Sequence, residues 1–293
     1  MPRSFPAKEN MNCFIIDKLV PRFSRRGSYT RHQLGEIDYR LFVGSQGTHA
    51  SVLLIIPARF QSSRFPGKPL ADLGGKTVIR RCYEQVCLAV DRERVFVATD
   101  DDRIAAECAA HGMSFVMTSD TCLTGTDRVA EVAEQRAAEW YVNVQGDEPF
   151  IDPAAVIAML NAVDAAGPDV FVINAYEVLH TEADFRSPTL PKAVTDLNGR
   201  LLYVSRASIP TTKKLEYRTA HRQVGMYAFR REALRRFAAC TEKTPLEEIE
   251  DVEILRFLEL GMGVQMIKVE SGGIAIDTPD DLARAQEFLR NKR

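Results

Sequence analysis

Short β-branched runs alternate with helical segments from residue 52 onward, and this alternation constrains the fold more than any other feature of the chain. The first run, VLLII at residues 52–56, stops at Pro57, which is typical of a buried strand. Further strands are predicted at residues 94–99, 114–117, 140–144, 170–175, 201–205, 224–229 and 264–269, and helices at 101–112, 126–138, 153–165, 246–260 and 279–289. This order favours an α/β fold in which helices cover both faces of a mostly parallel central sheet.

The pattern loosens between about residues 180 and 230, where turn residues separate short strands. An antiparallel extension of the sheet is expected there, of the kind that often makes dimer contacts. Residues 51–293 are expected to form one domain. Residues 1–50 carry eight Lys or Arg and four Asp or Glu, a net +4 against −6 for the rest of the chain. They are interpreted either as an extension of unknown role, which could be disordered, or as the product of a start codon assigned too far upstream.

Composition excludes several classes of protein. A net charge of −2 gives no electrostatic case for nucleic-acid binding, and no apolar run approaches the length of about 18 residues that spans a membrane. The six cysteines are scattered without a C-x-x-C motif, so reduced thiols in a cytoplasmic protein are expected. The five histidines form no cluster with zinc-ligand spacing.

A cationic loop, PARFQSSRFPGKPL at residues 57–70, follows the first predicted strand. In open α/β sheets, ligands bind at the carboxyl ends of the strands. Arg59, Arg64 and Lys68 suit a polyphosphate, because guanidinium groups pair with phosphate oxygens and lysine adds a compact charge. The loop is not a P-loop, because Lys68 is followed by Pro69, which has neither a hydroxyl nor an N–H. From charge alone, a solvated basic loop is an equally good interpretation.

Carboxylates follow two other apolar runs. The motif NVQGDEP at residues 143–149 ends a predicted strand with Asp147 and Glu148. Mg²⁺ prefers oxygen ligands and is commonly held by one or two carboxylates together with phosphate oxygens, so this strand end suits a metal–polyphosphate complex. An exposed acidic turn is the alternative. Asp277 follows the run IAI, and the next helix does not need it, because Thr278 and Asp281 can form the helix cap.

The helix predicted over residues 246–260 carries a carboxylate on an apolar face. At about 100° per residue, Leu246, Ile249, Val252 and Phe257 form one arc, and Glu253 falls inside it. A carboxylate on a buried face must be paired or must contact a ligand. Glu253 is therefore a candidate binding residue.

Together these segments resemble the nucleotidyltransferases that activate acidic sugars with CTP, and most of all the 3-deoxy-manno-octulosonate (Kdo) cytidylyltransferase family, or CMP-Kdo synthetases. The resemblance begins at about residue 52, continues to the C-terminus and includes TGTDR at 124–128, YVSRASIP at 203–210 and RQVGMY at 222–227. It implies a Rossmann-like nucleotidyltransferase fold, transfer of CMP from CTP to Kdo for lipopolysaccharide or capsule synthesis, a Mg²⁺ cofactor and a homodimer.

The resemblance also implies a role for each matching residue. Asp147 and Asp277 would hold Mg²⁺, and Arg59 and Lys68 would complete the catalytic set. The residues implied to bind the nucleotide are Arg59, Ser62, Arg64, Lys68, Thr99, Asp100, Thr126 and Arg128. Those implied to bind the acidic 2-keto-3-deoxy sugar are Gln145, Lys192, Arg206, Gln223, Tyr227 and Glu253.

Two positions depart from the Kdo pattern. Gln223 replaces a histidine of the family and Ile254 replaces a glutamine, both where the resemblance places the sugar. Cytidylyl transfer is therefore expected while the acceptor stays open between Kdo and another ulosonic acid, such as an amino-Kdo or a nonulosonic acid. A catalytically silent nucleotide-binding protein is the remaining alternative. No protein general base is predicted.

Overall fold

The structure is a computed structural model that describes residues 51–62, 64–271 and 274–291. The chain divides into two units, Met1–Ile37 and Asp38–Arg293, and the described residues all belong to the second. The expectation for residues 1–50 lies outside the described residues. Within them, no helix is both long enough and apolar enough to cross a bilayer. The five described cysteines, Cys82, Cys87, Cys108, Cys122 and Cys240, are free thiols.

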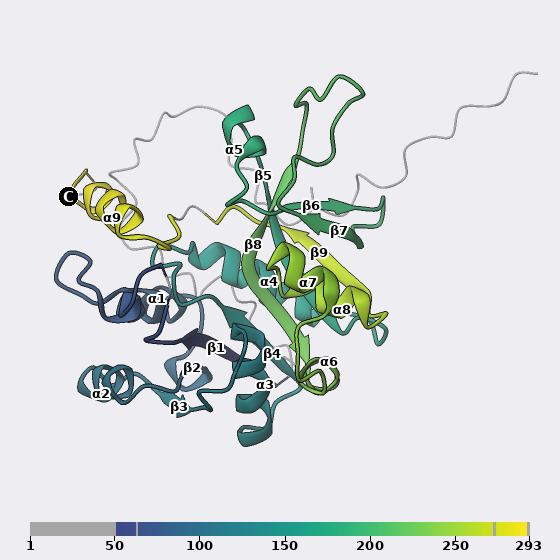
Figure 1. The fold of residues 1–293 in the computed structure, drawn as a ribbon. Helices are drawn as coiled ribbons and strands as arrows, with labels where there is room; N and C mark the ends of the chain where they lie inside the picture. Colours follow the sequence, from purple (N-terminus) through teal and green to yellow (C-terminus); the bar gives the residue numbers. More distant parts are fainter. Residues whose placement is uncertain (1–50, 63, 272–273, 292–293) are drawn as a thin grey trace, which may run out of the picture. The chain divides into compact units, whose positions relative to one another are not determined.

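A mixed sheet forms the centre of the described unit, with the strand order β3-β2-β1-β4-β8-β5-β9 (Figure 1). The parallel pairs are β1 with β2 and β4, β2 with β3, and β5 with β9, whereas β8 runs antiparallel to both of its neighbours. The strands are β1 Val52–Ala58, β2 Val95–Thr99, β3 Phe115–Met117, β4 Trp140–Val144, β5 Val172–Val178, β6 Lys192–Thr195, β7 Leu201–Ser205, β8 His221–Arg230 and β9 Val264–Lys268. The predicted mostly parallel α/β sheet is confirmed.

Helices cover both faces of this sheet, as its alternating side chains require. Alternate residues of β1 point to opposite sides: Leu54 and Ile56 join the core that α1, α2 and α4 cover, and Ile55 joins the core that α3, α6 and α8 cover. The helices are α1 Val78–Val86, α2 Asp102–Ala110, α3 Gly125–Gln135, α4 Pro153–Asp164, α5 Glu182–Arg186, α6 Arg231–Ala238, α7 Pro245–Glu250, α8 Ile254–Glu259 and α9 Pro279–Asn291.

The antiparallel extension is present, but its composition differs from the prediction. Strands β6 and β7 pair with each other, and β6 pairs with the first residues of β8. Strand β8 itself is not peripheral, because it lies between β4 and β5 in the main sheet. It is buried on both sides there, which its apolar run from Val224 onward already suits.

The prediction of one continuous helix over residues 246–260 is wrong, because two separate helices, α7 and α8, form there. Asp251 lies between them in the left-handed conformation, with φ 50°, a conformation that aspartate tolerates better than most residues. The apolar arc is lost as a result: Leu246 and Ile249 are exposed, whereas Val252 and Phe257 are buried. Glu253 therefore lies at the start of α8 and not in the middle of a helix.

Candidate active site

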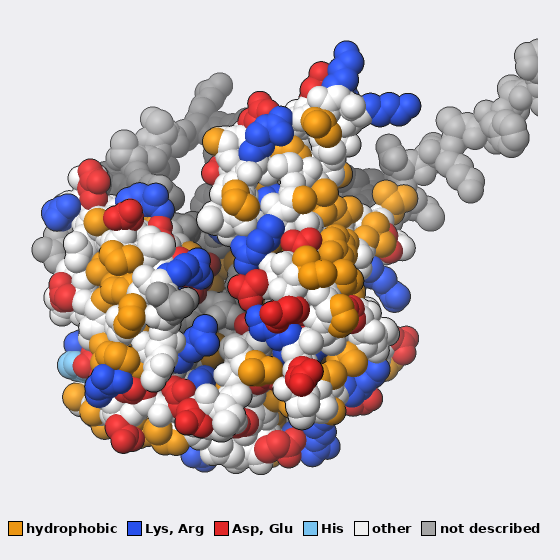
Figure 2. All heavy atoms as spheres, in the orientation of Figure 1, with side chains coloured by type: hydrophobic (Ala, Val, Ile, Leu, Met, Phe, Trp, Pro, Cys, Tyr) orange, Lys and Arg blue, Asp and Glu red, His pale blue; other side chains and the backbone are white. Residues whose placement is uncertain are grey.

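Two adjoining cavities lie at the carboxyl ends of the parallel strands. The first, here called the loop cavity, has a volume of about 310 Å³ and lies between the loop after β1, the start of α3 and the α7–α8 segment. The second, the strand cavity, has a volume of about 780 Å³ and lies between β5, β8 and the segment before α9. Residues that line both are Arg64, Gln145, Asp147 and Asp277. Figure 2 shows basic and acidic side chains close together across the hollow centre of this face.

Asp147 and Asp277 converge on one point at this border. The Lys68 ammonium lies 2.8 Å from Asp147 Oδ2 and 3.4 Å from Asp277 Oδ1. Arg64 Nη2 lies 3.2 Å from the same Asp277 oxygen. The two predicted metal aspartates and two cations of the loop, far apart in the sequence, thus form one cluster. Their carboxylates already meet around a positive charge, which fits the oxygen donor set that Mg²⁺ requires.

The backbone explains why these aspartates meet. A Cβ on Gly146 would lie 2.6 Å from the carbonyl oxygen of Pro57, so only glycine lets the end of β4 approach the end of β1 this closely. The backbone N–H of Ile276 donates to the carbonyl of Asp147 at 2.9 Å, which holds the C-terminal segment across the end of β4. As predicted, Thr278 and Asp281 cap α9 reciprocally, which leaves Asp277 to the cluster.

Burial and charge act on the ionisable groups of the cluster in opposite ways. Burial alone would lower the pKa of Lys68, but Asp147 and Asp277 outweigh it and hold that pKa above its ordinary value. Burial raises the pKa of the neighbouring Glu148 to about 7, and the charge of Asp147 adds to this effect. Lys68 therefore stays cationic at neutral pH and is able to pair with a phosphate group.

The rest of the cationic loop opens onto the loop cavity. Arg59 is exposed and lines it together with Ser62. The hydroxyl of Ser62 accepts a hydrogen bond from the backbone N–H of Phe65 at 3.3 Å. The four loop residues predicted to bind nucleotide therefore all reach one cavity.

The remaining predicted nucleotide residues divide between the cavity wall and its support. Arg128 lines the loop cavity, and its Nη2 donates to Asp100 at 3.2 Å. Thr99, Asp100 and Thr126 line neither cavity. Thr99 is buried and accepts from the backbone N–H of Asp101, and Asp101 caps α2. Asp100 therefore acts by orienting Arg128.

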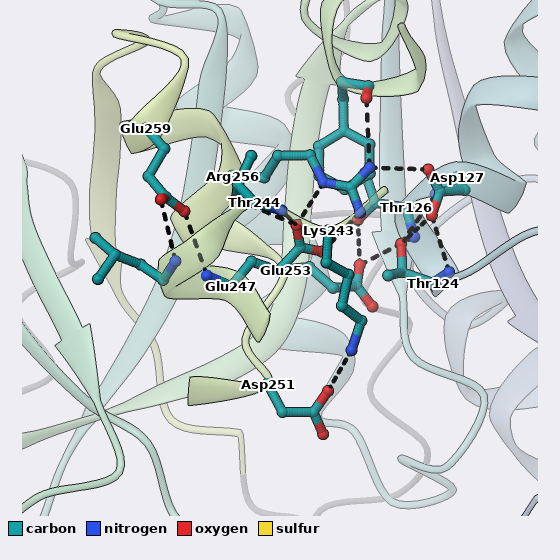
Figure 3. Close-up of polar contacts among 12 residues, drawn as sticks. Thr124, Thr126, Asp127, Lys243, Thr244, Glu247, Asp251, Glu253, Arg256 and Glu259 are labelled. Atoms are coloured by element: carbon teal, nitrogen blue, oxygen red, sulfur yellow. Dashed lines mark hydrogen bonds and ion pairs between the residues drawn. The ribbon is translucent and has the colours of Figure 1, made fainter. Parts of the chain in front are cut away.

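Glu253 holds the start of α3. Its carboxylate accepts from the backbone N–H of Gly125 at 3.1 Å. It also accepts from the backbone N–H of Thr126 at 2.9 Å and from the Thr126 hydroxyl (Figure 3). Burial raises the pKa of Glu253, and these hydrogen bonds oppose the rise. A negative charge at a helix N-terminus is favourable. Glu253 lines the loop cavity, but its hydrogen bonds give it a structural role that the sequence did not predict.

Lys192 and Arg206, both predicted to bind the sugar, donate hydrogen bonds to backbone carbonyl oxygens. Lys192 is fully buried, lines neither cavity, and donates to the carbonyl oxygens of Ser187 at 2.8 Å and Arg206 at 2.6 Å. Arg206 lines the loop cavity, and its guanidinium donates to the carbonyl oxygens of Glu250, Pro188 and Asp251. Lys192 therefore organises the backbone that carries Arg206.

The other predicted sugar residues lie around the strand cavity. Gln145 and Gln223 line it, whereas Tyr227 is buried behind Gln223 and lines neither cavity. Ile254, the second departure from the Kdo pattern, is fully buried in the apolar core beneath α8 and does not reach a cavity. Of the two departures from the Kdo pattern, only Gln223 therefore lines a cavity.

Two residues of the cavity walls, Lys243 and Glu177, gave no sequence signal. Lys243 and Asp251 form an ion pair of 2.8 Å at the loop cavity. Arg222 binds Glu177 at 2.6 Å in the strand cavity. Lys243 lies between predicted elements, and Glu177 lies beyond the end of its predicted strand, so neither stood next to a motif. The longer β5 observed here, which ends at Val178, is what brings Glu177 to the site.

Comparison with known proteins gives a consistent result. The sequence model of the cytidylyltransferase family matches residues 53–266. The chain is 40% identical over 249 residues to a 3-deoxy-manno-octulosonate cytidylyltransferase of Syntrophotalea carbinolica, covering 82% of this chain and 99% of the relative. It is 43% identical over 241 residues to an enzyme of the same name from Myxococcus xanthus, covering 80% and 95%.

A solved structure agrees with these sequence relatives. The fold is similar to that of a CMP:2-keto-3-deoxy-manno-octonic acid synthetase in complex with CTP, with a TM-score of 0.77 and 32% identity. The match covers 83% of this chain and all of that structure, 100%. Sequence and structure therefore point to the same set of proteins.

Proposed function

The chain belongs to the 3-deoxy-manno-octulosonate cytidylyltransferase family, and from that premise we propose that it transfers CMP from CTP to the anomeric hydroxyl of Kdo. The hydroxyl oxygen forms a bond to the α-phosphorus of CTP and loses its proton. The bond from the α-phosphorus to the bridging oxygen breaks, and pyrophosphate leaves. The product, CMP-Kdo, is an activated sugar for lipopolysaccharide or capsule synthesis.

The convergence of Lys68, Asp147 and Asp277 at the border of two cavities is the observation that carries this proposal. A cytidylyl transfer needs a nucleotide and an acceptor side by side, with the α-phosphorus between them. The loop cavity supplies the cationic wall that a triphosphate needs, and the strand cavity supplies neutral amides and ion-paired side chains that suit a hydroxylated sugar. The residues that line both cavities stand where the two substrates would meet.

Asp147 and Asp277 would hold Mg²⁺ in this arrangement. When bound with CTP, the ion would neutralise phosphate charge and lower the pKa of the attacking hydroxyl. Arg59, Arg64 and Lys68 bind the triphosphate and stabilise the charge that accumulates on pyrophosphate as it leaves. Such positioning, with donors fixed in advance, accounts for most of the catalysis in phosphoryl-type transfers.

One observation supports an acceptor other than Kdo. Gln223, which stands where the Kdo pattern has histidine, lines the strand cavity. The same transfer to another ulosonic acid would use every other residue unchanged. Pyrophosphate release from CTP and Mg²⁺, measured with a panel of 2-keto-3-deoxy acids, separates these acceptors. Absence of turnover with any of them, despite CTP binding in calorimetry, would instead indicate a silent nucleotide-binding protein.

Removing residues 1–50 should leave kcat and both KM values unchanged. Strand β1 begins at Val52, and every described residue that lines the loop cavity or the strand cavity lies at Pro57 or later. Steady-state kinetics of the shortened and full-length proteins test this expectation. A shortened protein that keeps its circular dichroism spectrum but loses turnover would mean that the first 50 residues complete the site.

We also expect a homodimer formed through the β6–β7 extension. Leu202 on β7 is 59% exposed and Leu197 in the preceding turn is fully exposed, and apolar side chains gather on the side of the extension seen in Figure 2. Exposed apolar patches commonly mark interfaces. Light scattering should give twice the chain mass of 32.8 kDa, and Leu202→Glu should lower it to a single chain. A monomeric wild type would refute this expectation.

A further inference from the structure

Asn174 has an amide whose orientation the backbone determines. It is fully buried on β5, next to the irregularity that shifts the register between β5 and β8. Its Nδ2 donates to the carbonyl oxygens of Val224 at 3.0 Å and Met226 at 2.9 Å. Carbonyl oxygens only accept hydrogen bonds, so the end of Asn174 that faces them must be its nitrogen. Asn174 Oδ1 is left as an acceptor on the opposite side.

Gln223 meets that acceptor with its own amide nitrogen. Its Nε2 donates to Asn174 Oδ1 at 3.0 Å and to the hydroxyl oxygen of Tyr227 at 3.4 Å. An amide nitrogen has two protons, so both are used. The reversed orientation would bring Gln223 Oε1 against Asn174 Oδ1, two acceptors without a proton between them, and would lose the bond in a buried place.

The remaining polar atom of this side chain, Oε1, faces the strand cavity. Neither hydrogen bond of the Gln223 side chain uses Oε1. Among the residues that the structure describes, the fully buried side-chain oxygens and nitrogens without a partner belong to Asn143 and Glu148 alone. Gln223 Oε1 is not among them, so this unpaired oxygen is accessible. Gln223 lines the strand cavity, so its free carbonyl oxygen is the atom open to a ligand there.

This oxygen belongs to the same wall as the catalytic cluster. A Cβ on Gly225 would lie 2.8 Å from Gln145 Cγ, so the side chain of Gln145 packs directly on β8, two residues from Gln223. Gln145 and Asp147 line the strand cavity with Gln223. A sugar bound in that cavity, with its anomeric hydroxyl near Asp147, would have another of its groups beside Gln223.

We infer that Gln223 is a specificity-determining residue that accepts a hydrogen bond from a hydroxyl or an ammonium group of the acceptor sugar, and that Asn174 imposes this polarity. The inference rests on the proposed function and defines its acceptor more narrowly. A histidine ring could offer either an N–H or a lone pair, whereas Gln223 held by Asn174 offers a lone pair only. A sugar with an ether or another pure acceptor at this place leaves Oε1 unpaired and is selected against.

The test compares Gln223→Met, which keeps the length of the side chain but removes its amide, with the wild type. Pyrophosphate release is measured with CTP, Mg²⁺ and an acceptor panel of Kdo, an aminated ulosonate, and deoxy and O-methyl derivatives of the preferred acceptor. For that acceptor, Gln223→Met should lower kcat/KM by roughly 5- to 150-fold while KM for CTP is unchanged. Gln135→Met, the same change on α3 at a residue that lines neither cavity, should have no effect.

The derivatives distinguish this contact from a general disturbance. One deoxy or O-methyl derivative should be a poor acceptor for the wild type, and Gln223→Met should handle it as well as the parent sugar, because the contact is already absent. The ratio of the wild-type kcat/KM values for aminated and hydroxylated acceptors identifies the donor as an ammonium or a hydroxyl group. The inference would be overturned if Gln223→Met and the wild type had equal kcat/KM for the preferred acceptor. It would also be overturned if each derivative lowered kcat/KM by the same factor in both proteins. A wild type that releases no pyrophosphate with any ulosonate would refute the proposed function itself.

Discussion

Asp147→Asn is expected to lower kcat by about 10³-fold or more while the fold is preserved, a loss of roughly 4 kcal/mol of transition-state stabilisation. The side chain keeps its shape, and the carbonyl oxygen of the new amide could still accept from Lys68, whose ammonium lies 2.8 Å from Asp147 Oδ2 in the wild type. What disappears is one of two converging negative charges, and a divalent cation needs charged oxygen ligands more than neutral ones. Steady-state pyrophosphate release with CTP and an ulosonate measures the effect.

The control is Asp102→Asn, which removes an exposed aspartate from the first turn of α2, away from both cavities. It should leave turnover and Mg²⁺ dependence unchanged. Raising the Mg²⁺ concentration should restore part of the activity of Asp147→Asn and should not affect the control. Near-normal turnover of Asp147→Asn at ordinary Mg²⁺ would mean that the metal is held elsewhere.

The sequence predicted this cluster because its members follow strands. Parallel strands place their carboxyl ends at one edge of a sheet, so topology brings together the loop that carries Lys68, which follows one apolar run, and Asp147, which follows another. The helix cap beside Asp277 did not need its carboxylate, and the resemblance to the Kdo enzymes then implied its role. None of these inferences required knowledge of a side-chain contact.

What the sequence could not predict depended on packing between distant segments. The left-handed Asp251 ends α7 within a continuous apolar pattern, and periodicity carries no signal for such a break. Lys192 has the charge of a ligand, but in the fold it satisfies two carbonyl oxygens. Ile254 stands where the Kdo pattern has a glutamine, but its side chain belongs to the core. Hydrogen-bond partners and packing neighbours far away in the sequence decided these cases.

Arg256 is the residue whose loss should destabilise the fold most among the charged groups of the α7–α8 segment. Its side chain is fully buried, and it binds Glu247 with both Nε at 2.6 Å and Nη2 at 2.7 Å, and Asp127 with Nη1 at 3.1 Å (Figure 3). Arg256→Met would leave Glu247 buried without a counter-charge. Removing one partner of a buried ion pair costs about 3–5 kcal/mol, so thermal unfolding should shift down by roughly 6–20 °C.

Two further variants identify the cause of that shift. Arg235→Met removes an exposed arginine that pairs with Glu134 on the surface, and it should leave the melting temperature unchanged. The double variant Arg256→Met with Glu247→Leu removes the stranded carboxylate as well, and it should recover part of the stability that Arg256→Met loses, because apolar side chains of similar size can replace a buried ion pair. Differential scanning calorimetry measures all three. If Arg256→Met has the same melting temperature as the wild type, the buried charges contribute no net stability. If the double variant is no more stable than Arg256→Met, the loss comes from the packing of the Arg256 side chain on Phe237, 3.7 Å from its ring centroid, and not from the unpaired carboxylate.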